Sequence, residues 1–372
     1  MFDLENVMFK LHAVQAQFGD SLILEFGTDA KRRYILVDGG PPNNFNDDLD
    51  SALQSIVQSG KLDAVILSHI DNDHIVGLLD LLAALEKDKA DGEPPRIAIG
   101  GLWHNSFQKS IDPDGEITQR MQTLMSVAGI ANVAMPFAVD AFFGVKEGNR
   151  LRILAKKLKL PVNKGFQNDL VMLETATQAK KFGKLSLRVV GPNQANLDKL
   201  RQDWLEWLAK AENMMTDPAA LANADISVPN LSSIVLLAKC DGKTILLTGD
   251  ARSDHILDGL EAAGLLTDGK MHIDVLKVPH HGSKRNITAK FFKAVTADKY
   301  VISANGKNDN PDHDTLAWIV EAAKNAGRNI EIIVTNTTPS TKKLKQTHKP
   351  ADFGYRLTVK PKADHSIVLQ LS

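Results

Sequence analysis

The stretch L-D-A-V-I-L-S-H-I-D-N-D-H-I-V-G-L-L, residues 62–79, decides the predicted fold. Residues 64–67 (A-V-I-L) are an apolar, β-branched run that is typical of a buried parallel strand, and the run ends at Ser68. After it, Ile75, Leu78 and Leu82 recur at helical spacing. The pattern therefore predicts a strand, a short polar loop and a helix, with the loop at a strand end, where α/β proteins usually bind ligands.

The polar loop holds two imidazoles and two carboxylates within six positions: His69, Asp71, Asp73 and His74. Bringing such groups together is costly unless a cation coordinates them or water solvates them. One alternative is that Asp71 or Asp73 caps the helix while the histidines lie on the surface, since Asp is a favoured N-cap residue. Four such residues so close together favour a metal site over that alternative.

Further acids and histidines follow other predicted strands. Asp38 follows the run 34–37, Asp250 follows 244–247, and the pair His280-His281 follows 273–278. Each has an ordinary alternative, because Asp-Gly is a common turn pair and histidines titrate and cap as readily as they bind metals. Together with the loop at 68–74, they are candidates for one site.

The motif S-H-x-D-x-D-H at 68–74 resembles the H-x-H-x-D-H signature of the metallo-β-lactamase superfamily, with Asp71 in place of the middle histidine. This variant, with T-G-D at 248–250 and H-H-G-S at 280–283, is similar to the soluble hydrolase domain of ComEC-type competence proteins. The resemblance covers nearly the whole chain apart from 137–184, which we interpret as a family-specific insertion because it has no sustained hydrophobic period.

The resemblance implies the roles of the site residues. One ion would be bound by Asp73, His74, Asp250 and His281, and a second by His69, Asp71 and the bridging Asp250. Asp38 would support the site from beneath, and Asp73, Asp250 and His280 would act in catalysis, with His280 contacting substrate or donating a proton. Asn230 stands about where a third histidine is expected, so the second set is rich in oxygen. We expect one or two divalent ions, zinc or manganese, since oxygen ligands favour manganese or magnesium whereas imidazole suits zinc.

Candidate substrate contacts are Asn230, Lys284, Arg285 and His313. The two cations directly follow the H-H-G-S motif, and an ammonium and a guanidinium beside a metal suit a phosphate. A solvated surface pair is the alternative for both. His313 is equally an expected helix-start residue for 315–326.

Composition narrows the class of protein. The 372 residues are 43% hydrophobic and 24% charged, which is ordinary for a globular domain. The net charge of −1 gives no footprint for non-specific nucleic-acid binding, so a nuclease would need a local basic patch. The single cysteine, Cys240, rules out an internal disulfide framework. With neither a signal peptide nor a membrane span predicted, we expect a cytoplasmic protein without a membrane partner.

These observations predict one α+β domain over residues 1–372, a four-layer αββα sandwich with two sheets packed face to face and helices outside. The favoured function is a metal-dependent hydrolase, a phosphodiesterase or nuclease that acts on DNA, a nucleotide or another phosphodiester through a metal-activated water. One alternative is a hydrolase of a small phosphoester, a lactone or a thioester, because the fold does not fix the substrate. Another is a non-catalytic regulatory protein that binds metal.

Overall fold

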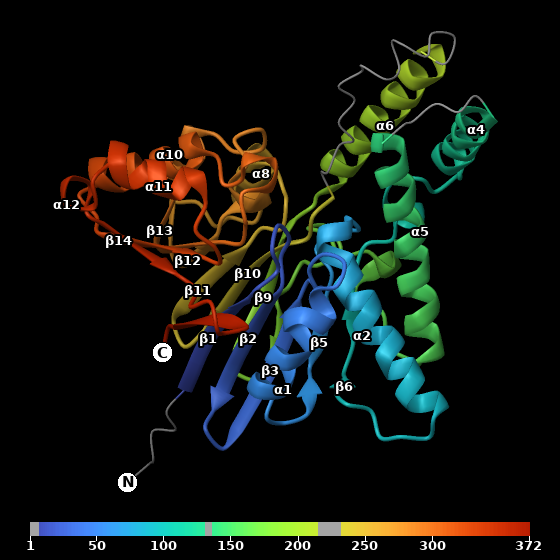
Figure 1. The fold of residues 1–372 in the computed structure, drawn as a ribbon, viewed down its shortest axis with the longest axis horizontal. Coiled ribbons are helices and arrows are strands. Elements are labelled where there is room, and N and C mark those ends of the chain that lie inside the picture. Colours follow the sequence, from blue (N-terminus) through green and yellow to red (C-terminus); the bar gives the residue numbers. More distant parts are fainter. Residues whose placement is uncertain (1–6, 131–135, 215–231) are drawn as a thin grey trace.

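The computed structural model describes residues 7–130, 136–214 and 232–372, and its backbone is built around two β-sheets (Figure 1). The first sheet has six strands in the order β16-β1-β2-β3-β5-β7. Its members are β1 (Val7–Val14), β2 (Leu22–Thr28), β3 (Lys31–Val37), β5 (Ala64–Ile66), β7 (Leu102–Trp103) and β16 (Ser366–Gln370). The predicted strand at 64–67 is confirmed as β5, which runs parallel to both β3 and β7.

The second sheet has eight strands in the order β15-β14-β13-β12-β11-β10-β9-β8. They are β8 (Lys180–Phe182), β9 (Leu185–Gly191), β10 (Val235–Cys240), β11 (Lys243–Leu247), β12 (Met271–Lys277), β13 (Val295–Ile302), β14 (Ile330–Val334) and β15 (Tyr355–Val359). Strands β11 to β15 are parallel, so the chain segments that follow β11, β12 and β13 leave the sheet at the same edge. The short strands β4 (Lys61–Leu62) and β6 (Ala98–Ile99) pair separately.

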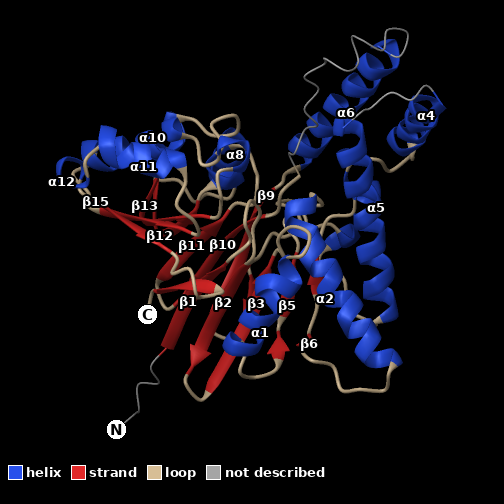
Figure 2. Cartoon of the chain, in the orientation of Figure 1, coloured by secondary structure: helices blue, strands red, loops and turns tan. Residues whose placement is uncertain are grey.

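Helices cover the outer faces of both sheets (Figure 2). The first sheet is covered by α1 (Asp50–Ile56) and α2 (Asn72–Ala90), with η1 (Phe45–Leu49) beside them, and α5 (Pro136–Lys157) packs against α2. The second is covered by α8 (Ser253–Ala262), α9 (Ala289–Ala294), α10 (His313–Asn325), α11 (Pro339–Thr347) and α12 (Pro350–Phe353). A separate group to one side contains α3 (Phe107–Ser110), α4 (Glu116–Ile130) and α6 (Gln194–Met214), held together around Trp204 and Trp207. Three single turns are η2 (Gln167–Asp169), η3 (Pro279–Gly282) and η4 (Lys307–Asp309).

The central core lies between the two sheets. Phe9 and Leu11 of the first sheet and Val275 and Val301 of the second are fully buried in one hydrophobic cluster. Alternate residues of a strand point to opposite faces, so Leu276 of β12, next to Val275, instead joins the outer cluster with α8 to α10. Apolar side chains therefore fill three interfaces, and the predicted α+β sandwich with αββα layers is confirmed. That one domain runs over residues 1–372 stays a prediction.

Two segments differ from what their sequence pattern indicates. The pattern of residues 96–102 is that of one strand, but the structure divides it between β6 and β7, which belong to different sheets. Gly100 lies between them, and a Cβ there would lie 2.5 Å from the carbonyl oxygen of Asp63. The segment 137–184, interpreted as an insertion because its sequence has no sustained hydrophobic period, begins within the 22-residue helix α5; that it is an insertion stays a prediction. Its Leu151, Leu154 and Ala155 are buried in the same cluster as residues of α2. These three positions have helical spacing but span little more than one turn, so they give no sustained hydrophobic period in the sequence.

None of the helices in the described ranges has both the length and the apolar character needed to cross a bilayer.

Candidate metal centre

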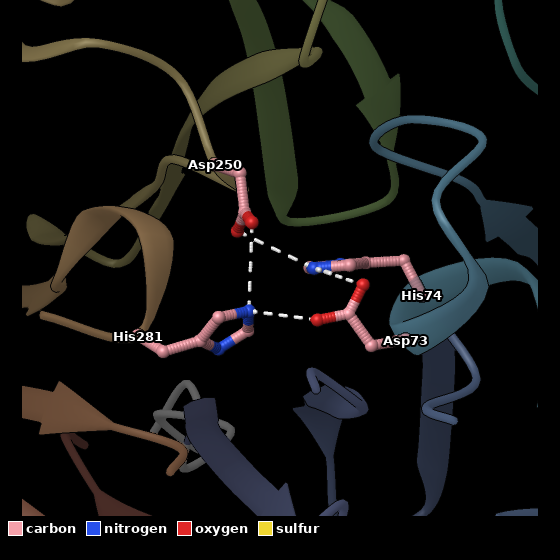
Figure 3. Close-up of side chains that lie close together, drawn as sticks. All are labelled: Asp73, His74, Asp250 and His281. Atoms are coloured by element: carbon pink, nitrogen blue, oxygen red, sulfur yellow. Dashed lines mark ion pairs between the residues drawn. The ribbon is translucent and has the colours of Figure 1, made fainter. Parts of the chain in front are cut away.

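The candidate centre lies where loops from the two sheets meet (Figure 3). His69 follows β5, and Asp73 and His74 belong to the first turn of α2. Asp250 follows β11, and His281 lies in η3 after β12. Because each side chain is placed at or just beyond a carboxyl end of a strand, segments distant in sequence converge on one point.

Local geometry at α2 and η3 aims the side chains inward. Asp71 is the N-cap of α2, yet its side chain makes no capping hydrogen bond, which argues against the capping alternative for this residue. In η3, His280 and His281 have φ values of 44° and 53°, in the left-handed region that non-glycine residues adopt at a cost of about 1 kcal/mol each. This backbone turn brings both imidazoles to Asp250.

Four side chains form one close group: Asp73, His74, Asp250 and His281. One ligand atom from each lies within 4.8 Å of the others. The Nε2 atom of His74 is 3.3 Å from Oδ1 of Asp250, and Nε2 of His281 is 3.5 Å from Oδ2 of Asp250. The Asp73 carboxylate closes the group, 3.3 Å from Nε2 of His281 (Figure 3). These residues are the set that the resemblance assigns to the first ion.

The residues of the second predicted set also lie close to Asp250. Nε2 of His69 is 3.5 Å from the carboxylate of Asp71 and 3.8 Å from Oδ2 of Asp250. Nε2 of His280 is 3.5 Å from the same oxygen. Asp250 is therefore shared by both sets, as a bridging ligand would be.

Hydrogen bonds behind the imidazoles fix which nitrogen faces the centre. Asp38 accepts hydrogen bonds from the backbone N–H of Ser68 at 2.7 Å and from Nδ1 of His74 at 2.9 Å. Nδ1 of His281 donates to the carbonyl oxygen of Ser303 at 3.0 Å. With protons held on Nδ1, the Nε2 atoms of both rings are left free to bind a metal. Asp38 thus lies behind His74, and its support of a metal site stays a prediction.

Unpaired atoms at the centre test whether a cation fits. The Nε2 atoms of His69, His74 and His281, and Oδ1 of Asp250, are buried and make no hydrogen bond within the described chain. Each such atom costs about 1–3 kcal/mol when left unsatisfied. Imidazole nitrogens and carboxylate oxygens that converge in this way are the donors that zinc and manganese accept, so the residues present fit a divalent cation.

Electrostatics within the group agree with this fit. Burial by itself would raise the pKa of Asp250, but the imidazoles of His281, His280 and His74 outweigh burial and bring that pKa well below its usual range. Burial lowers the pKa of His74, whereas the neighbouring acids, Asp250 first, raise it well above the usual value. Metal ligands must be deprotonated, so the affinity of this group for a cation should fall as the pH is lowered.

Two of the four predicted substrate contacts pair with other side chains. Lys284 pairs with Asp314 at 2.8 Å. His313 is the first residue of α10, which agrees with the alternative that it starts a helix, and its Nε2 lies 2.9 Å from Oγ1 of Thr347. Arg285 is exposed, and Asn230 lies outside the described residues. The structure therefore does not bring Lys284 or His313 into the group of candidate ligands.

Two buried charged residues were missed by the sequence analysis. Asp20 lies in the connection between β1 and β2, and Lys277 is the last residue of β12. A lysine inside an apolar strand (I-D-V-L-K-V, 273–278) indicates a buried ion pair, because a fully buried lysine requires an acidic partner. Which acid would meet it depends on how the two sheets pack.

One family model and several curated relatives match parts of this chain. Residues 17–117 match the family model described as "Metallo-beta-lactamase superfamily". Microtubule-associated protein 1A from Homo sapiens is 26% identical over 260 residues, 66% of this chain and 8% of that protein. The Rattus norvegicus protein is 26% identical over 263 residues, with the same coverage. The chain thus spans about 8% of the length of the curated relatives that it matches.

Solved structures with a distant likeness include the metallo-beta-lactamase fold protein YhfI from Bacillus subtilis, 11% identical with a TM-score of 0.41. That likeness covers 98% of this chain and 100% of the other. A diphosphatase from the PhnP family is also 11% identical, with a TM-score of 0.40 and 98% of each chain covered. The family match and the αββα layers define a metallo-β-lactamase fold with a candidate His/Asp metal site, and the match supports a place in that superfamily.

Proposed function

We propose that this protein is a metal-dependent hydrolase. The observation that carries the proposal is the convergence of unpaired Nε2 atoms with the Asp250 carboxylate, from three segments far apart in the sequence. Asp73, His74, Asp250 and His281 would hold one ion, and His69, Asp71 and Asp250 a second. An ion bound there lowers the pKa of a bound water toward neutrality and polarises the oxygen of the bond under attack.

The chain's own residues would organise the reaction around that centre. Asp38 and the carbonyl of Ser303 hold the Nδ1 protons, so the ligand nitrogens need no rearrangement when a metal binds. The His280 side chain is 27% exposed, whereas that of His281 is 3% exposed, so His280 can reach a substrate while still contacting Asp250. We assign His280 to proton donation toward the leaving group.

The proposed substrate is a phosphodiester, in DNA or in a nucleotide. A carboxylate shared by two ligand sets suits a two-ion clamp on both the attacking and the leaving oxygen of a phosphoryl group. The ComEC-type motifs support the same class of substrate. Because Lys284 is paired with Asp314, the exposed Arg285 is the better remaining candidate for a phosphate contact. Hydrolysis of a small phosphoester, a lactone or a thioester is the alternative, and a cytoplasmic location stays a prediction.

A second candidate is a non-catalytic binding role with a retained metal. It is favoured by the curated relatives, whose name describes association with microtubules rather than a reaction.

Metal content by elemental analysis, followed by turnover assays with added manganese or zinc, tests both candidates. The substrates are a bis-aryl phosphate, a lactone reporter, and single- and double-stranded DNA. We expect at least one equivalent of metal and cleavage of the phosphodiesters, lost in Asp250→Asn. The matched control is Asp254→Asn, since Asp254 lies four residues further on and pairs with Arg252 at the surface. Metal without turnover on any substrate would favour the binding role, and protein that takes up no metal would refute both.

A further inference from the structure

A buried ion pair lies directly behind the candidate centre. Lys277 is 0% exposed and Asp20 is 1% exposed, and the Lys277 ammonium contacts Oδ2 of Asp20. Lys277 also donates to the carbonyl oxygen of Val278 at 3.1 Å. Removing two charges from water is expensive, and apolar residues of similar size often give a fold that is as stable. Core packing by itself therefore does not account for this pair.

The free oxygen of the pair faces a candidate ligand. Within the described residues, Oδ1 of Asp20 makes no hydrogen bond, and it lies 3.5 Å from Nδ1 of His281. The same nitrogen donates to the carbonyl oxygen of Ser303. Asp20 thus stands behind His281 as Asp38 stands behind His74, on the side of the ring opposite the Nε2 that points at the centre.

The loop that carries Asp20 is fastened to two of the other segments that form the centre. The backbone N–H of Asp20 donates to the carbonyl oxygen of Asp73 at 3.2 Å. Gly19 packs so closely on Asp73 that a Cβ there would lie 1.9 Å from that carbonyl oxygen. The hydroxyl of Ser303 donates to the carbonyl oxygen of Gly19 at 2.6 Å. Any movement of this loop would be transmitted to Asp73 and to the carbonyl that holds His281.

The partner lysine is tied to the remaining segment. The carbonyl oxygen of Lys277 accepts a hydrogen bond from Oγ1 of Thr248 at 2.8 Å, two residues before Asp250. The ion pair therefore joins the loop after β1 to the ends of β11 and β12, across the two sheets.

We propose that Asp20 and Lys277 are positioning residues for the metal centre. Asp20 helps to keep the Nδ1 proton of His281 in place so that Nε2 faces the ion, and Lys277 fixes Asp20 and balances its charge. This inference rests on the proposed metal centre. Loss of a supporting group of this kind typically weakens metal binding about 10- to 100-fold.

The test is zinc affinity, measured by competition with a chromogenic chelator, for the full chain and two double variants. Asp20→Asn/Lys277→Met removes both buried charges and leaves neither unpaired. The matched control is Asp274→Asn/Lys243→Met, the same chemical change in a partly exposed pair whose acid lies on β12 three residues before Lys277. Circular dichroism and urea unfolding report whether each variant is folded, and Asp20→Ser/Lys277→Met, which also leaves no buried charge unpaired, replaces the first double variant if that one does not fold.

We expect zinc affinity to fall about 10- to 100-fold in the Asp20→Asn/Lys277→Met variant and to match the wild type in the control. If the folded variant binds zinc within twofold of the wild type, the positioning role is refuted while the metal centre stands. If the wild type itself binds no zinc or manganese, the metal centre fails, and this inference fails with it.

Discussion

Gly77→Ala should disturb both the fold and the metal centre. Gly77 lies in α2 against Gly39, which follows β3, and a Cβ at Gly77 would lie 1.9 Å from the carbonyl oxygen of Gly39. Real Cβ atoms essentially never approach closer than 3.0 Å, and the obstacle is backbone, which cannot rotate away. The helix must therefore move by about 1 Å relative to the loop, because packed interiors leave no free space to absorb the methyl group.

The size of the effect follows from two opposing terms. Overpacking of this kind costs about 1–3 kcal/mol, and replacing Gly by Ala inside a helix returns up to about 1 kcal/mol. We expect the free energy of unfolding to fall by about 1–2 kcal/mol. The same displacement stretches the 2.9 Å hydrogen bond between Asp38 and His74, because Asp38 directly precedes Gly39 and His74 lies on the moving helix. Zinc affinity should then fall about tenfold or more.

Urea unfolding and chelator competition measure the two effects. Val76→Ala is the control, since Val76 is a half-buried neighbour in the same helix and shortening its side chain creates no steric overlap. That variant should lose some stability but keep its affinity for zinc. A Gly77→Ala protein as stable as the wild type, with unchanged zinc affinity, would refute the idea that this glycine contact sets the distance between Asp38 and His74.

Three further predictions concern charge and hydrogen bonding. Lys277→Met should lower the free energy of unfolding by about 3–5 kcal/mol in urea, since Asp20 stays buried without its partner; a loss below about 1 kcal/mol would contradict this. Asp38→Asn should weaken zinc binding about 10- to 100-fold in chelator competition, because its amide cannot accept from both Ser68 and His74 as the carboxylate does; unchanged affinity would speak against that role. Burial lowers the pKa of His104 to about 4 in the folded chain, whereas an unfolded histidine has a pKa of about 6.5. Below pH 6.5 the unfolded chain therefore takes up a proton that the folded chain does not, and the free energy of unfolding should fall by up to about 3 kcal/mol between pH 6.5 and pH 4. Urea unfolding at each pH measures this fall, which should be smaller in His104→Gln; an equal fall in the variant would exclude His104 as the cause.

The sequence by itself identified the local parts of the centre. The loop with His69 and His74 stands out because four ligand-type residues share six positions directly after an apolar strand. Asp250 and His281 were found in the same way, at the ends of predicted strands. The hydrophobic period of a strand or helix, two or 3.6 residues, and the end of a strand are local properties, so residues close together in the sequence are enough to predict them.

Tertiary structure decided what depends on contacts between distant segments. The pairing of Asp20 with Lys277 joins residues 257 positions apart, and it exists because two sheets pack face to face. In the same way, Lys284 pairs with Asp314 and not with a residue of the candidate centre, because α10 places Asp314 beside it. Sequence spacing specifies which residues can share a strand end, whereas the partner that each buried charge meets is set by the packing of the sheets and helices around it.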